Sequence, residues 1–312
     1  MQKVLVRNEK EQSAKPPENT ATQTPNPTGQ ACLDTAFGRP RNFLNYRFAY
    51  AVISQRARGL SIGVNLNPDK QCNFDCFYCE VNRDEIPRDH QLDVKVMSAE
   101  LQNLLGLVYE NKLREAAWFR HLPAELLQLK SVALSGEGEP TLCRKFGEVV
   151  REVVHIRSQG KFPFFKIVLI TNTAGLNLPE TRVGLQLLTT QDEVWVKLDA
   201  GTQDYMNQVN RPDITLRKVL ANILSIGRER PVIIQSLFPL ISGAEPPPGE
   251  IEQYVQRLQE LKAGGAQITM VQIYSAHRPP HRGDCCGHLP LKSLSYIARR
   301  VREVTGLKAE VF

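Results

Sequence analysis

Short apolar runs rich in β-branched residues alternate along the chain with longer segments of helical periodicity. Six or seven such runs are evident, among them residues 61–66, 131–134, 166–171, 193–198, 232–238 and 268–274. Strands that alternate with helices are typical of βα units and a parallel sheet. The pattern therefore predicts an α/β protein, an open or closed barrel of parallel strands with its helices outside.

The helical period is clearest in residues 250–262. Their apolar positions recur every three or four residues, at Ile251, Tyr254, Val255, Leu258 and Leu261. This spacing gives a helix one apolar face with which to cover a sheet. Ser98 is predicted to cap a first helix over residues 99–109, and a closing strand is predicted over residues 307–312.

The beginning of the chain has a different composition. Residues 8–31 contain four prolines and almost no large apolar side chain. Such a segment cannot bury enough apolar surface to offset the entropy lost on ordering. We therefore predict a disordered N-terminal tail over residues 1–36 and a single folded core domain over residues 37–312.

Composition narrows the protein class only slightly. No run approaches eighteen apolar residues, and charged residues interrupt the apolar start after Val6, so neither a membrane span nor a secretory signal is expected. This predicts a cytoplasmic protein with no membrane partner. The net charge of +6 permits contact with a phosphate-rich partner but does not demand one. Seven cysteines, three of them within eight residues, favour metal binding in a reducing compartment.

The three clustered cysteines have the spacing C-x-x-x-C-x-x-C and follow the apolar run at 61–66. They are Cys72, Cys76 and Cys79, with Tyr78 just before the last. Thiolates so spaced can bind three irons of a cubane, which leaves one iron open because no fourth cysteine is near. We predict a 4Fe-4S cluster here. Structural cysteines, a zinc site and a plain electron-transfer cluster are the alternatives, although the second knuckle of a zinc module and the Cys-Pro of a ferredoxin are missing.

Other polar residues stand where the predicted strands end. A glycine-containing turn, GEGEP, follows the run at 131–134, and Asn172 follows the run at 166–171. Lys197 and Asp199 are two residues apart, so both point to one face of the strand at 193–198. Opposite charges facing a barrel interior are costly unless they are paired or functional. We interpret Lys197 and Asp199 as catalytic residues, with a buried structural ion pair as the alternative.

The order of these motifs over residues 45–312 resembles the radical S-adenosylmethionine (SAM) superfamily. Within it, SIGVNLNPDKQCNFDCFYCE, SGEGEPTL, ITNTAGL, KLDAG, VNRP and VQIYSAHRPP resemble bacterial iron-sulfur oxidoreductases grouped with the wyosine-base synthases, which modify transfer RNA. The GEGEP turn is similar to the superfamily's Gly-Gly-Glu-Pro turn, which binds the amino group of SAM. The resemblance implies SAM-binding roles for Tyr78, Gly138, Glu139 and Asn172.

The resemblance also implies a fold and a reaction. The fold is a partial (β/α)6 barrel of parallel strands with outer helices, and the cofactors are a 4Fe-4S cluster and S-adenosyl-L-methionine. The reaction is reductive cleavage of SAM to a 5'-deoxyadenosyl radical that abstracts hydrogen from an unidentified substrate. A reducing electron donor such as flavodoxin or ferredoxin is the implied partner. The alternatives are an iron-sulfur or metal-binding protein without SAM chemistry and a tRNA-modifying enzyme.

Two further cysteine features bear on these alternatives. Wyosine synthases carry a second cluster on three cysteines upstream of the SAM motif, and this chain has only Cys32 there. A substrate other than the tRNA base is therefore expected, and tRNA is an unsupported partner. Cys285 and Cys286 lie between His281 and His288, but their spacing matches no known metal site, so we predict a loop with exposed thiols.

Overall fold

The computed structural model describes Ala36 and residues 43–276, 280–281 and 286–312. Except for Ala36, the predicted N-terminal tail lies outside the described residues, so the tail and the domain boundary stay predictions. Ala36 itself is buried, and its carbonyl accepts a hydrogen bond of 2.7 Å from the backbone N–H of Ile53.

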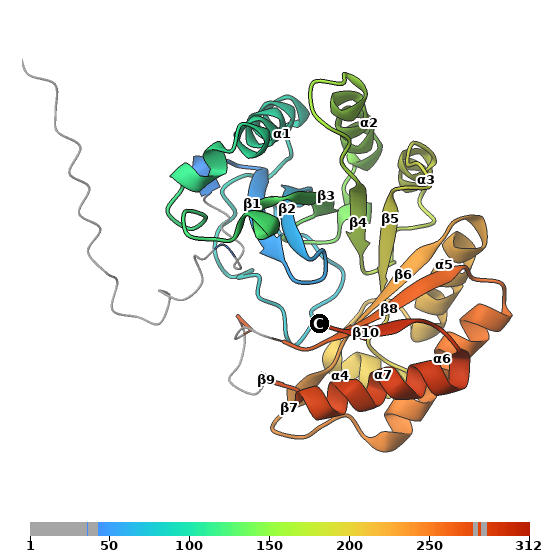
Figure 1. Cartoon of the computed structure of the whole chain (residues 1–312). Coiled ribbons are helices and arrows are strands. Elements are labelled where there is room, and N and C mark those ends of the chain that lie inside the picture. The colour runs from blue at the N-terminus through green and yellow to red at the C-terminus, as the bar shows by residue number, and fades with distance from the viewer. Residues whose placement is uncertain (1–35, 37–42, 277–279, 282–285) are drawn as a thin grey trace, which may run out of the picture. The chain divides into compact units, whose positions relative to one another are not determined.

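One sheet of eight strands organises the described residues (Figure 1). In spatial order it consists of β1 (Ala49–Ser54), β2 (Gly59–Asn65), β3 (Leu129–Ser135), β4 (Ile167–Thr171), β5 (Glu193–Lys197), β6 (Val232–Leu237), β8 (Ile268–Tyr274) and β10 (Ala309–Val311). Every neighbouring pair is parallel except β1 and β2. A separate antiparallel pair joins β7 (Pro239–Ile241) to β9 (Cys286–His288). All six apolar runs are parallel strands, so the predicted partial barrel is confirmed, while the edge strand β1 was not foreseen.

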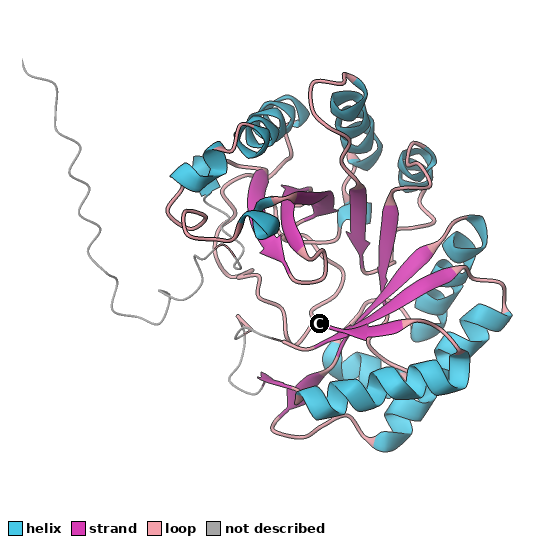
Figure 2. Cartoon of the chain, in the orientation of Figure 1, coloured by secondary structure: helices cyan, strands magenta, loops and turns pink. Residues whose placement is uncertain are grey.

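Helices follow most of the parallel strands and lie outside the curved sheet (Figure 2). They are α1 (Val94–Tyr109), α2 (Phe146–Ser158), α3 (Pro179–Gln186), α4 (Gln203–Val209), α5 (Leu216–Glu229), α6 (Pro248–Ala263) and α7 (Leu291–Thr305). The prediction for residues 250–262 is confirmed by α6. No helix in the described part of the chain is long and apolar enough to cross a membrane.

The start of the first helix differs from the prediction. Helix α1 begins at Val94, because the Asp93 carboxylate accepts hydrogen bonds from the backbone N–H groups of Lys95 (2.9 Å) and Val96 (3.2 Å). Those are the amides that a helix leaves without partners in its first turn. Ser98 lies inside α1, and its hydroxyl donates to Glu152 Oε1 of α2 at 2.6 Å. The prediction of a Ser98 cap was wrong.

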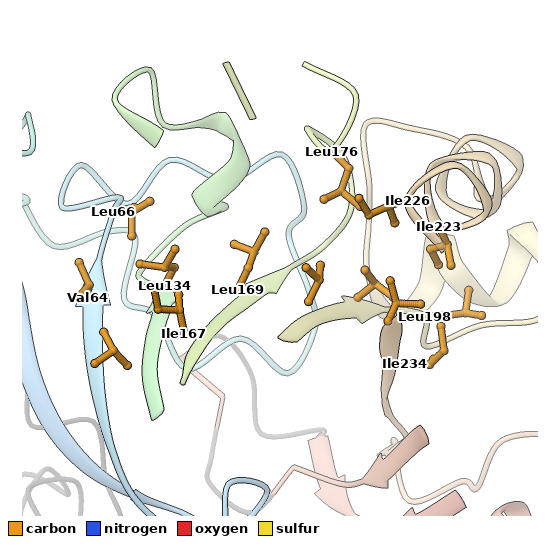
Figure 3. Packing of buried hydrophobic residues seen from close by; sticks show 14 of the residues in the cluster. Val64, Leu66, Leu134, Ile167, Leu169, Leu176, Leu198, Ile223, Ile226 and Ile234 are labelled. Carbon is orange, nitrogen blue, oxygen red and sulfur yellow. The ribbon is translucent and has the colours of Figure 1, made fainter. Parts of the chain in front are cut away.

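The two faces of the sheet have different characters. Outward-facing side chains such as Leu198 and Ile234 pack against Ile223 and Ile226 of α5 (Figure 3). The alternate residues face inward, where the apolar cluster is small and contains Val168, Trp195 and Ile233, with Ile170 and Met270 packed against it. Because side chains alternate along a strand, the remaining inward positions face the same space, and most of them carry polar or small residues such as Ser61, Gly63 and Gln235. The inner face can therefore hold a site.

Candidate active site

The predicted site residues meet at one edge of the sheet. Residues 67–84, here called the cysteine loop, follow β2, and the GEGEP turn follows β3. Asn172 follows β4, and Lys197 ends β5. A cavity of about 480 Å³ is lined by eight of the residues singled out from the sequence, namely Cys72, Cys76, Tyr78, Cys79, Gly138, Glu139, Asn172 and Lys197. The carboxyl ends of parallel strands are where barrel enzymes gather their active sites.

The cysteine loop is held from two sides by backbone hydrogen bonds. On one side the N–H of Glu139 donates to the carbonyl of Gln71 at 3.0 Å. On the other side the loop lies along residues 209–213, which begin at the last residue of α4. That contact consists of the bonds Phe77 N to Val209 O (2.9 Å), Asp75 N to Arg211 O (3.3 Å) and Asp213 N to Asn73 O (3.1 Å). The loop is thus clamped between the β3 turn and residues 209–213.

Glycine is required where the β3 turn meets the cysteine loop. A Cβ on Gly138 would lie 1.7 Å from the carbonyl oxygen of Gln71. Gly136 has a φ of +157°, and a Cβ there would lie 2.4 Å from Asn65 Oδ1. Both contacts are shorter than any real Cβ contact, and the first involves backbone that cannot rotate away. The turn therefore approaches the loop closely only because Gly136 and Gly138 lack side chains.

The Glu139 carboxylate is buried and fully engaged. Its Oε1 accepts the N–H of Thr141 at 3.0 Å and the hydroxyls of Thr141 and Thr171. Its Oε2 accepts the N–H of Asn172 at 2.6 Å. Burial raises the pKa of Glu139, and these hydrogen bonds oppose that rise. Both oxygens are committed to the protein, so Glu139 joins the β3 turn to the end of β4.

Asn172 connects the end of β4 to the cysteine loop. Its side-chain nitrogen donates to Asn73 Oδ1 at 2.9 Å and lies 3.7 Å from Cys72 Sγ. Its side-chain oxygen accepts the N–H of Ala174 at 2.9 Å, which is an Asx turn. The oxygen therefore shapes the loop after β4, while the nitrogen contacts the loop that carries the cysteines.

Lys197 and Asp199 form an ion pair in a buried network. Lys197 Nζ lies 2.8 Å from Asp199 Oδ2, and the Asp199 side chain is fully buried. The Tyr78 hydroxyl donates to the same carboxylate and accepts from Lys197. Burial is the largest single effect and lowers the pKa of Lys197, but the charge and hydrogen bond of Asp199 together with Cys76 and Tyr274 outweigh it, so the net pKa is raised and the lysine stays charged. The two residues thus form the ion pair that was the alternative to a catalytic role, and only the lysine lines the cavity, so the catalytic role stays a prediction.

Asn210 completes this network and was missed in the sequence. Its side-chain nitrogen donates to Asp199 Oδ2 (2.8 Å) and lies 3.2 Å from the Tyr78 hydroxyl and 3.6 Å from Cys76 Sγ. The motif VNRP, which contains Asn210 beside Arg211, was the signal in the sequence. Arg211 instead lies half-exposed, 3.6 Å from Asp75. Sequence alone does not distinguish a buried asparagine from one on a loop surface.

The chemistry of the thiols suits an iron-sulfur cluster. Burial raises the pKa of Cys72 to about 11 and also raises that of Cys76, so as free thiols both are protonated at neutral pH, whereas bound metal removes the proton. The N–H of Phe74 lies 3.4 Å from Cys72 Sγ, and N–H groups beside sulfur are the contacts that tune cluster cysteines. In the described part of the chain no three Cys, His, Asp or Glu side chains converge on a single metal ion. Ligands to separate irons of a cubane are spread more widely than ligands to one zinc ion.

The second cysteine pair is only partly described. Cys286 lies half-buried in β9, whereas Cys285 lies outside the described residues. The prediction of a loop with exposed thiols at this pair therefore stays a prediction.

Solved structures show which fold this is. The chain is similar to a radical SAM methyltransferase from Sphaerobacter thermophilus, with a TM-score of 0.58 at 15% identity over 85% of this chain and 68% of that one. It is also similar to Streptococcus suis SuiB (TM-score 0.54, 12% identity, 83% and 51% covered). A third similar structure is TYW1 with a lysine-pyruvate adduct (TM-score 0.52, 15% identity, 84% and 85% covered). The chain has the partial-barrel fold of radical SAM enzymes.

Comparisons with curated sequences give weaker matches than the solved structures and name no common function. No family model matches the chain. A UPF0026 protein of Synechocystis is 28% identical over 58% of this chain and 59% of its own length, and one of Helicobacter pylori is 24% identical over 76% and 70%. A protein named GTPase Obg from Brachyspira hyodysenteriae is 27% identical over 57% of this chain. The chain spans 59% and 23% of the lengths of the Synechocystis and Brachyspira proteins.

Proposed function

We propose that the chain is a radical SAM enzyme in which Cys72, Cys76 and Cys79 hold one 4Fe-4S cluster and the adjoining cavity binds SAM. The observation that carries the proposal is that these three cysteines and the Gly138 turn line one cavity at the carboxyl ends of β2 and β3. The fold shared with radical SAM enzymes supports it. Such a cluster, once reduced, supplies the electron that cleaves SAM to methionine and a 5'-deoxyadenosyl radical, which abstracts hydrogen from a substrate.

The residues around the cysteines have separable tasks in this proposal. Gly138 presents bare backbone to the cavity, which suits close approach by the amino acid part of SAM. Asn172 supplies an amide at the same edge. Lys197 keeps a positive charge at the cavity wall, where it can act on substrate, and Asp199 and Tyr78 fix its position. A reducing protein such as flavodoxin or ferredoxin would deliver the electron.

The test is release of 5'-deoxyadenosine when anaerobically reconstituted protein is mixed with SAM and a strong reductant. The wild type should release it, and the triple alanine variant of the three cysteines should not. Cys76→Ala should also lose the iron, whereas Cys143→Ala, outside the cysteine loop, should keep it. A Cys76→Ala protein with full iron content and activity would refute the ligand assignment.

Two competing functions have their own readouts. An electron carrier would bind four irons per chain yet neither bind nor cleave SAM, which equilibrium binding with labelled SAM would reveal. A tRNA-modifying enzyme would bind tRNA with an affinity that falls steeply as salt rises, because phosphate contacts release counterions.

A further inference from the structure

A second group of polar residues lies on the inner face of the barrel, and none of the tasks assigned above uses it. Its members are Arg56, in the turn between β1 and β2, Gln235 of β6, and Gln272 and Tyr274 of β8. Arg56, Gln235 and Tyr274 line the same cavity as the cysteines. Gln235 and Gln272 are register partners on the adjacent strands β6 and β8. These residues bring a cation and two amides together inside the barrel.

Arg56 points into the barrel from its turn. Its guanidinium carbon lies 4.5 Å from the centre of the Tyr274 ring and 5.2 Å from that of Trp195, and one N–H donates to Gln235 Oε1. A guanidinium has five N–H donors. No carboxylate of the described chain forms an ion pair with Arg56, in contrast to Lys197, which Asp199 neutralises. Arg56 thus brings to the cavity a positive charge whose remaining donors are available.

Gln272 is a second observation, independent of Arg56, because its buried amide has no hydrogen-bond partner in the described structure. It is fully buried, and within the described structure neither its side-chain nitrogen nor its oxygen has a hydrogen-bond partner. Its strand neighbours Val271 and Ile273 belong to the outer core, so Gln272 faces inward, as does Tyr274. Buried side-chain amides are normally hydrogen-bonded, and an exception is explained by a bound water, a bound ion or a functional role.

The negative charges of the cavity lie elsewhere. Its lining carboxylates are Glu80, Glu137 and Glu139. Glu80 belongs to the cysteine loop, and the other two belong to the turn after β3. All three therefore lie beyond the carboxyl ends of β2 and β3, whereas Arg56 precedes the start of β2 at Gly59. The Arg56 side chain nevertheless reaches Gln235, the register partner of Lys197, so the charges are closer together than the seven residues of β2 between these backbone positions.

We propose that Arg56, Gln235 and Gln272 form an anion subsite that holds the carboxylate or phosphate group of a small substrate molecule. Arg56 offers paired N–H donors to the anion, and the side-chain nitrogens of the two glutamines can donate to it as well. An anion held here shares the cavity with the cysteines, so the rest of the molecule can extend toward them. The claim that this anion belongs to the substrate rests on the proposed function; the subsite itself does not.

Ligand-observed NMR on the folded chain tests the subsite directly. The probes are succinate, inorganic phosphate and uncharged succinamide, at low ionic strength. At least one anion should bind with a Kd in the millimolar range, and succinamide should bind at least tenfold more weakly. Whichever anion binds more tightly shows whether the subsite prefers a carboxylate or a phosphate group. Binding of all three alike, or of none, would overturn the proposal.

Matched variants separate the subsite from general surface charge. Arg56→Gln should weaken anion binding at least tenfold, and the uncharged change Gln272→Leu should weaken it several-fold. Arg58→Gln is the control, because Arg58 is in the same turn but points to Glu310 (2.6 Å) with 70% of its side chain exposed. Equal losses in Arg56→Gln and Arg58→Gln would overturn the subsite, and circular dichroism of each variant verifies folding.

The two proposals fail separately. Deoxyadenosine release by the wild type is measured without any probe. Anion binding by a protein that never releases deoxyadenosine would refute the radical SAM proposal and retain the subsite. Release by a protein that binds none of the anions would refute the subsite alone.

Discussion

At the scale of single residues, substitution of Gly138 shows whether iron binding by the cysteine loop requires the close approach of the two backbones. Gly138→Ala places a methyl group 1.7 Å from the Gln71 carbonyl, so either the turn or the cysteine loop must move. We expect a loss of about 1–3 kcal/mol in the free energy of unfolding. We also expect loss of most of the iron bound on anaerobic reconstitution, measured as iron and sulfide per chain.

The control for this change is another glycine. Gly106 lies inside α1, and a Cβ there would meet nothing within 4 Å. Gly106→Ala should therefore raise stability by about 0.5–1 kcal/mol, because alanine restricts the unfolded chain more than glycine does. Normal iron binding by Gly138→Ala would contradict the argument.

Asp199 supports a second residue-scale prediction, on the buried charge of Lys197. Asp199→Asn leaves that ammonium without its partner inside the barrel, at a cost of about 3–5 kcal/mol in urea unfolding. Adding Lys197→Met should restore part of this loss, because the double variant contains no unpaired charge. If Lys197→Met makes the Asp199→Asn protein still less stable, the pair does not control stability here.

At the scale of elements, the cysteine loop depends on residues 209–213 as much as on its own sequence. Asn210→Ala removes hydrogen bonds to Asp199 and Tyr78 and a contact to Cys76. The buried Asp199 oxygen then loses a donor, so the expected cost is about 1–3 kcal/mol in urea unfolding. Asn207→Ala, an exposed change in α4, should stay within about 0.5 kcal/mol of the wild type. Equal losses of unfolding free energy in the two variants would show that Asn210 does not stabilise the cysteine loop.

The elements also show what the sequence could predict. The inner strands were predictable, because their outward residues are apolar and their lengths match a strand. Strand β1 (Ala49–Ser54) was not predictable. It pairs antiparallel with β2 through a hairpin, and the turn between them has no Asn-Gly or Asp-Gly sequence that would indicate a hairpin. Serine often caps helices, but α1 begins more than one turn before Ser98, and Asp93 is its cap. Local composition identifies candidate caps, and tertiary contacts choose among them.

At the scale of the whole molecule, the cavity was predictable in position but not in its full lining. Motifs at the ends of four successive strands had to meet, because parallel strands end at one edge. Arg56 and Gln272 could not be assigned in this way. The Arg56 side chain contacts Gln235 of β6 and Tyr274 of β8, which are four and five strands away from β2 in the sheet. Such contacts depend on the curvature of the sheet, which no residue pattern encodes.

The same architecture predicts which part of the molecule responds to the cluster. Between β2 and α1 the chain has no helix and one isolated β-bridge, at Phe74, so the cysteine loop depends on its bonds to neighbouring segments and not on regular secondary structure of its own. A ligand that binds only the folded state stabilises it, and here it would join three points of this loop. Removing iron should therefore lower the Tm and speed hydrogen exchange in residues 67–84 and 209–213, while α6 exchanges as before. Hydrogen exchange of reconstituted and iron-free protein, with Cys76→Ser as a cluster-free reference, measures this. A uniform acceleration over all helices would mean instead that the cluster supports the whole barrel and not one clamped loop.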